Sequence, residues 1–253
     1  MTFFFTGEGP TDYGRQAFGS ETWQEGAAMY IFRKTAASLG LEHVDIVPID
    51  KKSYAQVHLQ RLPHTIKGRG QTCYKFLMYL QLHKSHTSDE KQQPAVFYCD
   101  IDKLPGAKNA SETVCKRHYQ DETEHINAAI KCFARPCIAM MPLKMIENWL
   151  LSDKAAFQKA FDTTACPALP PKPELIWGDD EEPISNYPKH FMDRVLAPLL
   201  HCNCKQGEVS GHTELFVDIA QNTDIQTLKE KCPISFVPFY DSLKQLLGDI
   251  SHD

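Results

Sequence analysis

Asp100 and Asp102 are two carboxylates separated by one residue, and they follow the apolar run 96–99. An apolar run of this kind, bounded by Pro94 and Pro105, is typical of a strand buried on both faces of a sheet. Ligands of open α/β sheets gather at the carboxyl ends of such strands. Unpaired acids are costly to bury there, but their oxygens are good ligands for Mg²⁺. The pair therefore indicates a metal or phosphate site at this strand end.

Three more acids follow other apolar runs. Glu8 comes after the run 2–6 and lies between two glycines, and Asp12 follows four residues later. Glu147 comes shortly after the run 136–141. If these strands are parallel neighbours, the acids meet at one edge of the sheet, where they repel one another unless a cation is present. We therefore expect this group of carboxylates to bind Mg²⁺ or Mn²⁺.

The elements that position these acids alternate between strands and helices. We expect strands over 2–6, 43–49, 95–99 and 136–141, and helices over 20–39, 71–84, 111–134 and 144–161. This alternation is typical of an α/β fold, in which helices cover both faces of a mostly parallel sheet. Pro48 lacks a backbone N–H, which indicates that the second strand lies at an edge of the sheet or ends there.

The composition changes after residue 162. Prolines punctuate a connector over 163–187, and helical spacing returns over 188–200, 214–221, 225–231 and 235–247. We therefore expect an α/β domain over 1–162, a Pro-rich connector over 163–187, and a small C-terminal helical subdomain over 188–253.

The composition is that of an ordinary globular protein. The chain has 253 residues, of which 42% are hydrophobic and 23% are charged, which suits one large domain or a domain with an appendage. No stretch approaches the ~20 apolar residues that a membrane helix needs, and acids fall where the apolar part of a signal peptide would lie. The nine cysteines are scattered, which favours reduced thiols over a disulfide framework. We therefore expect a cytoplasmic protein with no membrane segment.

One segment is positively charged, although the net charge of the whole chain is −5. Residues 51–88 contain no Asp or Glu, and their cationic residues are Lys51, Lys52, Arg61, Lys67, Arg69, Lys75 and Lys84. Such a segment forms either a surface that faces phosphate groups or an ordinary solvated face.

The acidic motifs resemble those of the TOPRIM fold, in which one strand ends in a glycine-flanked Glu and a later buried strand ends in Asp-x-Asp. The stretch GEGPTD, 7–12, resembles the Glu-Gly-x-Thr-Glu motif of the overcoming-lysogenization-defect (OLD) nucleases. Glu8 matches its first acid, and Asp12 stands where that family has a second Glu. The stretches MIENWLLSD, 145–153, and PELIWGD, 173–179, resemble small bacterial TOPRIM proteins encoded beside ABC-type or SMC-like ATPases in defence loci.

This resemblance implies a metal-dependent nuclease that cleaves DNA or RNA. In that scheme Glu8 acts as general base or metal ligand, and Asp100 and Asp102 hold Mg²⁺ or Mn²⁺. Asp12 and Glu147 complete or support a second metal position. The metal orients water and stabilises charge on the phosphate.

The resemblance also implies contacts outside the metal site. Lys144 is a candidate for stabilising charge on the phosphate, the alternative being a surface lysine. The basic residues expected to contact the nucleic-acid backbone are Lys51, Lys52, Arg61, Lys67 and Arg69. Such contacts do not recognise the base sequence. The chain carries no ATPase motif, so an ABC-type or SMC-like ATPase would be a separate subunit of an antiphage defence system. A homo-oligomer is also compatible with the motifs.

Two other functions remain open. A TOPRIM-like subunit without turnover would bind its partner or nucleic acid through the same residues. A small-molecule phosphohydrolase of the haloacid-dehalogenase kind would use Asp100 as nucleophile and Asp102 as acid, although Leu104 stands where that family has Thr or Val. The glycine pattern near Glu8 does not fit a dinucleotide site, because Asp12 replaces its last glycine.

A zinc site is the weakest of the metal hypotheses. Its candidate ligands are His201, Cys202, Cys204, His212 and Cys232. The one-residue spacing between the first two cysteines is tighter than zinc motifs use, so we expect free thiols.

Overall fold

The computed structural model describes residues 1–17, 20, 22–59, 62–85, 87–101, 111–202 and 212–250. Asp102, Arg61 and Leu104 lie outside the described residues, as does Cys204 of the candidate zinc segment.

The centre of the fold is a four-stranded sheet with the order β4-β1-β5-β6. Its strands are β1 (Thr2–Thr6), β4 (Asp45–Pro48), β5 (Ala95–Tyr98) and β6 (Cys137–Met140). All three pairings are parallel. The α/β fold class is therefore confirmed, and so is the edge position of the strand that contains Pro48.

Helices cover both faces of the sheet because successive strand residues point to opposite sides. Phe3 and Phe5 of β1 belong to one buried cluster, whereas Phe4 belongs to the other. The first cluster is completed by α1 (Ala27–Ser38), α6 (Ile146–Leu150), α7 (Lys154–Ala160), α8 (Pro188–Cys202), α9 (His212–Asn222), α10 (Ile225–Lys231) and α11 (Phe236–Ile250). The second is completed by α2 (Lys51–Ala55), α3 (Arg69–His83) and α5 (Glu112–Ile130).

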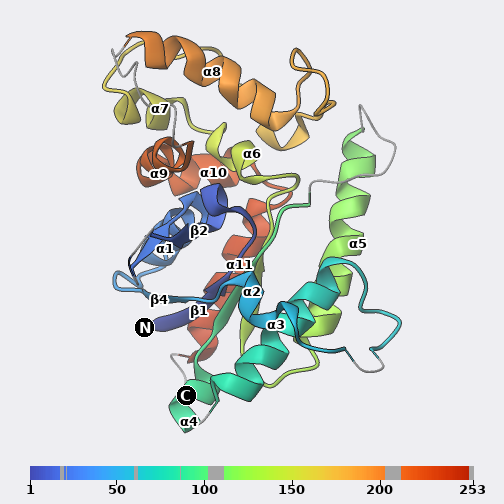
Figure 1. The fold of residues 1–253 in the computed structure, drawn as a ribbon. Coiled ribbons are helices and arrows are strands. Elements are labelled where there is room, and N and C mark those ends of the chain that lie inside the picture. The colour runs from blue at the N-terminus through green and yellow to red at the C-terminus, as the bar shows by residue number, and fades with distance from the viewer. Residues whose placement is uncertain are drawn as a thin grey trace.

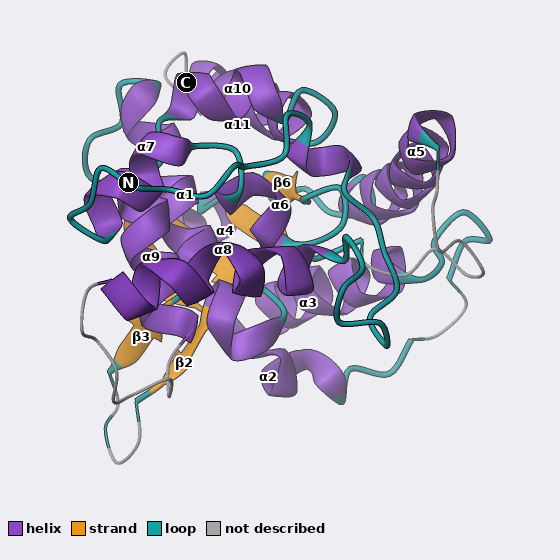
Figure 2. Ribbon diagram, turned by 90° about the horizontal axis from the view of Figure 1, so that it is seen from above, coloured by secondary structure: helices purple, strands orange, loops and turns teal. Residues whose placement is uncertain are grey.

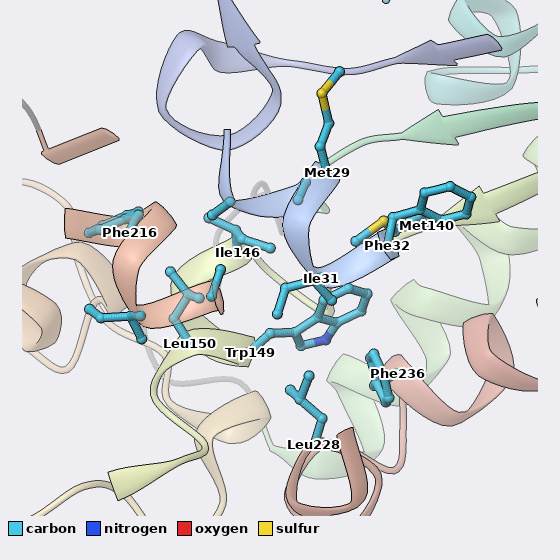
Figure 3. Packing of buried hydrophobic residues seen from close by; sticks show 14 of the residues in the cluster. Met29, Ile31, Phe32, Met140, Ile146, Trp149, Leu150, Phe216, Leu228 and Phe236 are labelled. Carbon is cyan, nitrogen blue, oxygen red and sulfur yellow. The ribbon is translucent and has the colours of Figure 1, made fainter. Parts of the chain in front are cut away.

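Trp149 of α6 lies at the centre of the first cluster. Its indole N–H donates a hydrogen bond of 2.8 Å to Oγ of Ser235, and its ring meets that of Phe236 edge-on at 5.1 Å. Figure 3 shows labelled side chains of α1, α6, α10 and α11 gathered around this indole. The helices that follow the Pro-rich connector thus share a core with the sheet.

The segment after β1 differs from the predicted helix over 20–39. A short antiparallel ribbon, β2 (Gly14–Gln16) and β3 (Trp23–Glu25), comes first, and α1 begins only at Ala27. Trp23 lies on β3, where its ring packs on that of Tyr13 with the ring centres 4.9 Å apart.

The predicted helix over 144–161 is also two helices. Asp153 lies between them and caps α7. Its carboxylate accepts hydrogen bonds from the backbone N–H groups of Ala155 and Ala156, so a new helix begins there. Two short helices, α2 and α4 (Ser88–Gln92), were not predicted.

The two ends of the strands face different surroundings. The helix α4 leads into β5 at the amino edge, whereas α6 follows β6 at the carboxyl edge. Figure 1 shows α8 at the top of the view, above α6 and α7, and α4 at the bottom. Figure 2, seen from above, shows the helices arranged around the orange strands. The carboxyl edge, where the acids lie, is therefore on the side of α8.

Candidate functional site

The candidate site lies at the point where the chain changes direction across the sheet. After β1 the chain passes to β4 on one side, and after β5 it passes to β6 on the other. Doubly wound sheets bind ligands in the crevice that forms at such a switch point. Glu8 follows β1 and Asp100 follows β5, and these strands are paired in register with Thr6 opposite Phe97. The expected meeting of the two acid-bearing strand ends is thus confirmed.

Asp12 reaches the site on a π-helical turn, η1 (Gly9–Tyr13). A Cβ on Gly7 would lie 2.8 Å from Cβ of Tyr13 and 2.9 Å from Cδ1 of Tyr98, so only glycine permits this packing. On its other side the turn is supported by Gly26, where a Cβ would lie 2.4 Å from the carbonyl oxygen of Asp12. Because neither glycine has a side chain, the turn can pack closely against the end of β5.

Asp12 and Asp100 lie together at this edge. Burial raises the pKa of Asp12 to about 6, and the charge of Glu8 contributes to the rise. Hydrogen bonds with Asp100 and Tyr98 act in the opposite direction. The phenol of Tyr98 also donates a hydrogen bond of 2.5 Å to Oδ1 of Asp100. These carboxyl groups are close enough for their charges to interact directly.

Glu147 brings a fourth acid from the first turn of α6. Its exposed fraction is only 3%, and its Oε2 is buried without a hydrogen-bond partner. Burial raises the pKa of Glu147 to about 8, and the charge of Asp12 adds to this rise. A buried carboxylate oxygen without a partner is costly. Glu147 is therefore an independent indication that this edge binds a ligand.

The helix α8 contributes two residues that the sequence reasoning missed. The charge of Lys189 lowers the pKa of both Asp12 and Glu147, while that of Asp193 raises the pKa of Glu147. The two residues are four apart, which places them on one face of the helix. That spacing after Pro188 was visible in the sequence, but nothing in it pointed to the distant strands.

Glu8 forms an ion pair with a residue of the basic segment 51–88. Nζ of Lys51 lies 2.7 Å from Oε1 of Glu8. Lys51 and Lys52 are exposed on α2, Lys67 is exposed, and Arg69 is half-buried at the start of α3. The structure therefore brings the first of the predicted backbone-binding residues to the acidic edge.

Lys144 is buried, so the alternative of a surface lysine is wrong. Its exposed fraction is 2%, and its ammonium lies 4.1 Å from the centre of the Trp177 ring and 4.4 Å from that of Tyr187. Such cation–π contacts favour a desolvated ammonium. Because Tyr187 immediately precedes α8, this contact holds the start of that helix against the end of β6.

The described acids supply oxygen donors only, which suits Mg²⁺ or Mn²⁺ better than soft metals. Glu8 and Asp100 act on the pKa of Asp12, and the charge of Asp12 acts on that of Glu147. Among the described residues, however, no group of three or more His, Cys, Asp or Glu side chains has an arrangement that could hold a metal ion. The contribution of Asp102 lies outside the described residues.

Among the cysteines whose side chains the structure describes, namely Cys73, Cys99, Cys115, Cys132, Cys137, Cys166 and Cys232, there is no disulfide, as expected. No described helix has the length and apolar character that crossing a bilayer requires. Comparisons with protein-family models, curated proteins and solved structures found no match to this chain.

Proposed function

We propose that this chain is a TOPRIM-like, metal-dependent nuclease that hydrolyses phosphodiester bonds of DNA or RNA with Mg²⁺ or Mn²⁺. The proposal is supported by the electrostatic links that join Asp12 to Glu8, Asp100 and Glu147 at the switch point. One of these acids, Glu147, has a buried oxygen without a partner. A cation would neutralise this cluster and occupy that oxygen.

The residues at the edge and those on the neighbouring helices would have different roles. Glu8, Asp100 and Asp102, supported by Asp12 and Glu147, would hold the metal, which supplies activation of water and charge stabilisation at the phosphate. Lys189 would offset the remaining negative charge from the side of α8. The exposed Lys51, Lys52 and Lys67 and the half-buried Arg69 would bind the sugar-phosphate backbone. Such contacts give salt-dependent affinity without recognition of the base sequence.

The wider role is also part of the proposal. A separate ABC-type ATPase partner and a place in antiphage defence are supported by the resemblance of the stretches 145–153 and 173–179 to TOPRIM proteins of defence loci. A cytoplasmic location agrees with the free described cysteines.

The test uses the purified chain with MgCl₂ or MnCl₂ and three substrates: supercoiled plasmid, tRNA and p-nitrophenyl phosphate. We expect nicking of the plasmid or cutting of the tRNA that EDTA abolishes. Asp100→Asn should abolish the same cleavage, whereas Asp241→Asn, at an exposed acid of α11, should retain it.

The other outcomes identify the alternatives. Hydrolysis of p-nitrophenyl phosphate alone would indicate a small-molecule phosphohydrolase. Binding of Mn²⁺ and nucleic acid without hydrolysis of any substrate would indicate a binding subunit without turnover. Unchanged cleavage by a folded Asp100→Asn variant would contradict the assigned site.

A further inference from the structure

The ion pair between Lys51 and Glu8 joins the basic segment to the acidic edge. The two charged atoms are 2.7 Å apart, and the side chains are 52% and 31% exposed. Ion pairs at this level of exposure are weak and readily exchanged. The position of Lys51 is therefore better explained by what holds its backbone than by the pair itself.

Rigid elements place Lys51 opposite Glu8. The hydroxyl of Thr6, at the end of β1, donates a hydrogen bond of 2.7 Å to the carbonyl of Ile49, and its oxygen lies 3.1 Å from the phenol oxygen of Tyr54, which can donate to it. Tyr54 is the buried residue of α2, and Asp50 caps that helix by accepting a hydrogen bond from the backbone N–H of Lys52. The start of α2 is thus fixed to the strand that carries Glu8, so the approach of Lys51 is built into the fold.

The ammonium of Lys51 competes with any metal that Glu8 binds. It holds Oε1, one of the two oxygens that Glu8 can offer to a cation. A divalent ion carries twice its charge and binds several carboxylates at once. Lysine has a long, flexible stem and moves easily once displaced. Residues 51–88 contain no Asp or Glu, and the positive charge of this segment favours an anionic substrate as the next partner of the ammonium.

We propose that Lys51 occupies the cation position at Glu8 until a divalent metal displaces it, and that its released ammonium then binds a phosphate group of the nucleic acid. The second step rests on the proposed function, whereas the first requires only that Glu8 binds the metal. Lys51 is thereby both a competitor of the metal and a substrate-positioning residue. Its removal must change the two affinities in opposite directions.

The experiment compares Lys51→Met with the wild-type chain. Titration calorimetry with MnCl₂, without nucleic acid, should show Mn²⁺ binding tightened about threefold, because a weak competing ion pair is lost. Fluorescence anisotropy with a single-stranded oligonucleotide in CaCl₂ should show weaker binding, and the slope of log K against log salt should fall by about one.

Two further variants act as controls. Lys51→Arg keeps the positive charge opposite Glu8 and should keep the wild-type Mn²⁺ affinity. Lys52→Met removes the neighbouring charge of the same helix and should leave the Mn²⁺ affinity unchanged. Because Lys51 is exposed, the circular dichroism of its variants should match that of the wild-type chain.

Each half of the proposal has its own contradicting result. Unchanged Mn²⁺ affinity in Lys51→Met overturns the exchange at Glu8. Tighter Mn²⁺ binding with an unchanged oligonucleotide affinity and salt slope overturns the phosphate contact. If the wild-type chain binds no Mn²⁺, the metal site of the proposed function fails as well, a result distinct from wild-type binding that Lys51→Met leaves unaltered.

Discussion

Tyr98 and Asp100 lie two residues apart at the end of β5 and are joined by a hydrogen bond of 2.5 Å from the phenol to Oδ1. Complete burial raises the pKa of Tyr98 well above its ordinary value, and the nearby negative charge of Asp100 raises it further. The phenol therefore stays protonated and serves as a donor. It fixes the orientation of the carboxylate that both the metal and the phosphatase hypotheses place at the centre of the chemistry.

Tyr98→Phe should weaken Mn²⁺ binding. The substitution removes the donor that orients Asp100, and loss of such a supporting hydrogen bond typically weakens metal affinity by about tenfold or more. Titration calorimetry with MnCl₂ measures the change. Tyr119→Phe is the matched control, because the Tyr119 hydroxyl is directed to the carbonyl of Ser235 and not to the acidic edge. Equal affinities in the two variants would contradict an orienting role for Tyr98.

Glu147→Gln should stabilise the metal-free chain, and more so at high pH. In the folded chain the pKa of Glu147 is about 8, compared with an ordinary value of 4.5. Folding therefore favours the protonated acid, so the stability that this proton contributes is complete below pH 4.5 and is lost as pH rises through 8. A neutral amide avoids the loss, which corresponds to about 5 kcal/mol for a rise of this size.

The measurement is urea unfolding in EDTA at pH 5 and pH 9, for the wild type and for Glu147→Gln. The free energy of unfolding should diverge between the two proteins as pH rises. Adding MnCl₂ at pH 8 should then stabilise the wild type more than the variant, since a ligand that binds only the folded state raises its stability. A pH-independent difference would show that Glu147 titrates normally.

Much of the site was predictable because its signals are local. Apolar runs define the strands, and the acids that follow them must lie at the carboxyl edge once the strands are parallel. The pairing of β1 with β5 confirms that reasoning for Glu8 and Asp100. The position of Asp12 at the same edge could also be predicted, because it is only four residues beyond Glu8.

The missed features depend on packing between distant segments. Lys189 and Asp193 reach the edge only because α8 packs on α6, and no local pattern encodes that contact. The burial of Lys144 depends in the same way on Trp177 and Tyr187, which lie beyond the connector's prolines. The start of α1 depends on how Gly26 fits beneath Asp12.

Gly7→Ala should destabilise the chain and disturb the acidic edge together. The added methyl group would lie within 2.9 Å of atoms of both Tyr13 and Tyr98, which are buried and cannot easily retreat. Overpacking of this kind costs about 1 to 3 kcal/mol. Urea unfolding and Mn²⁺ titration report the two effects. Gly248→Ala in α11 is the control, since no described atom outside the adjacent backbone of α11 lies within 4 Å of its added methyl, and alanine favours a helix.

Glu174→Ala should destabilise the whole chain and not only its C-terminal helices. Glu174 lies in the short 3-10 helix η2 (Pro173–Leu175) and is buried. Its carboxylate accepts hydrogen bonds of 2.8 Å from the backbone N–H groups of Ile234 and Ser235, and a third from the hydroxyl of Ser235. Losing them leaves buried donors unsatisfied, which costs roughly 3 kcal/mol or more.

The shape of the unfolding curve tests how the C-terminal helices relate to the sheet. Ser235 also accepts the hydrogen bond from Trp149, so Glu174 is linked to the core that covers β1, β5 and β6. Urea unfolding followed by circular dichroism should therefore show one transition that moves to lower urea in Glu174→Ala. Glu181→Ala, at an exposed acid of the same connector, should leave it in place. Two transitions, with only one displaced, would instead show that the helices after residue 188 unfold as a separate unit.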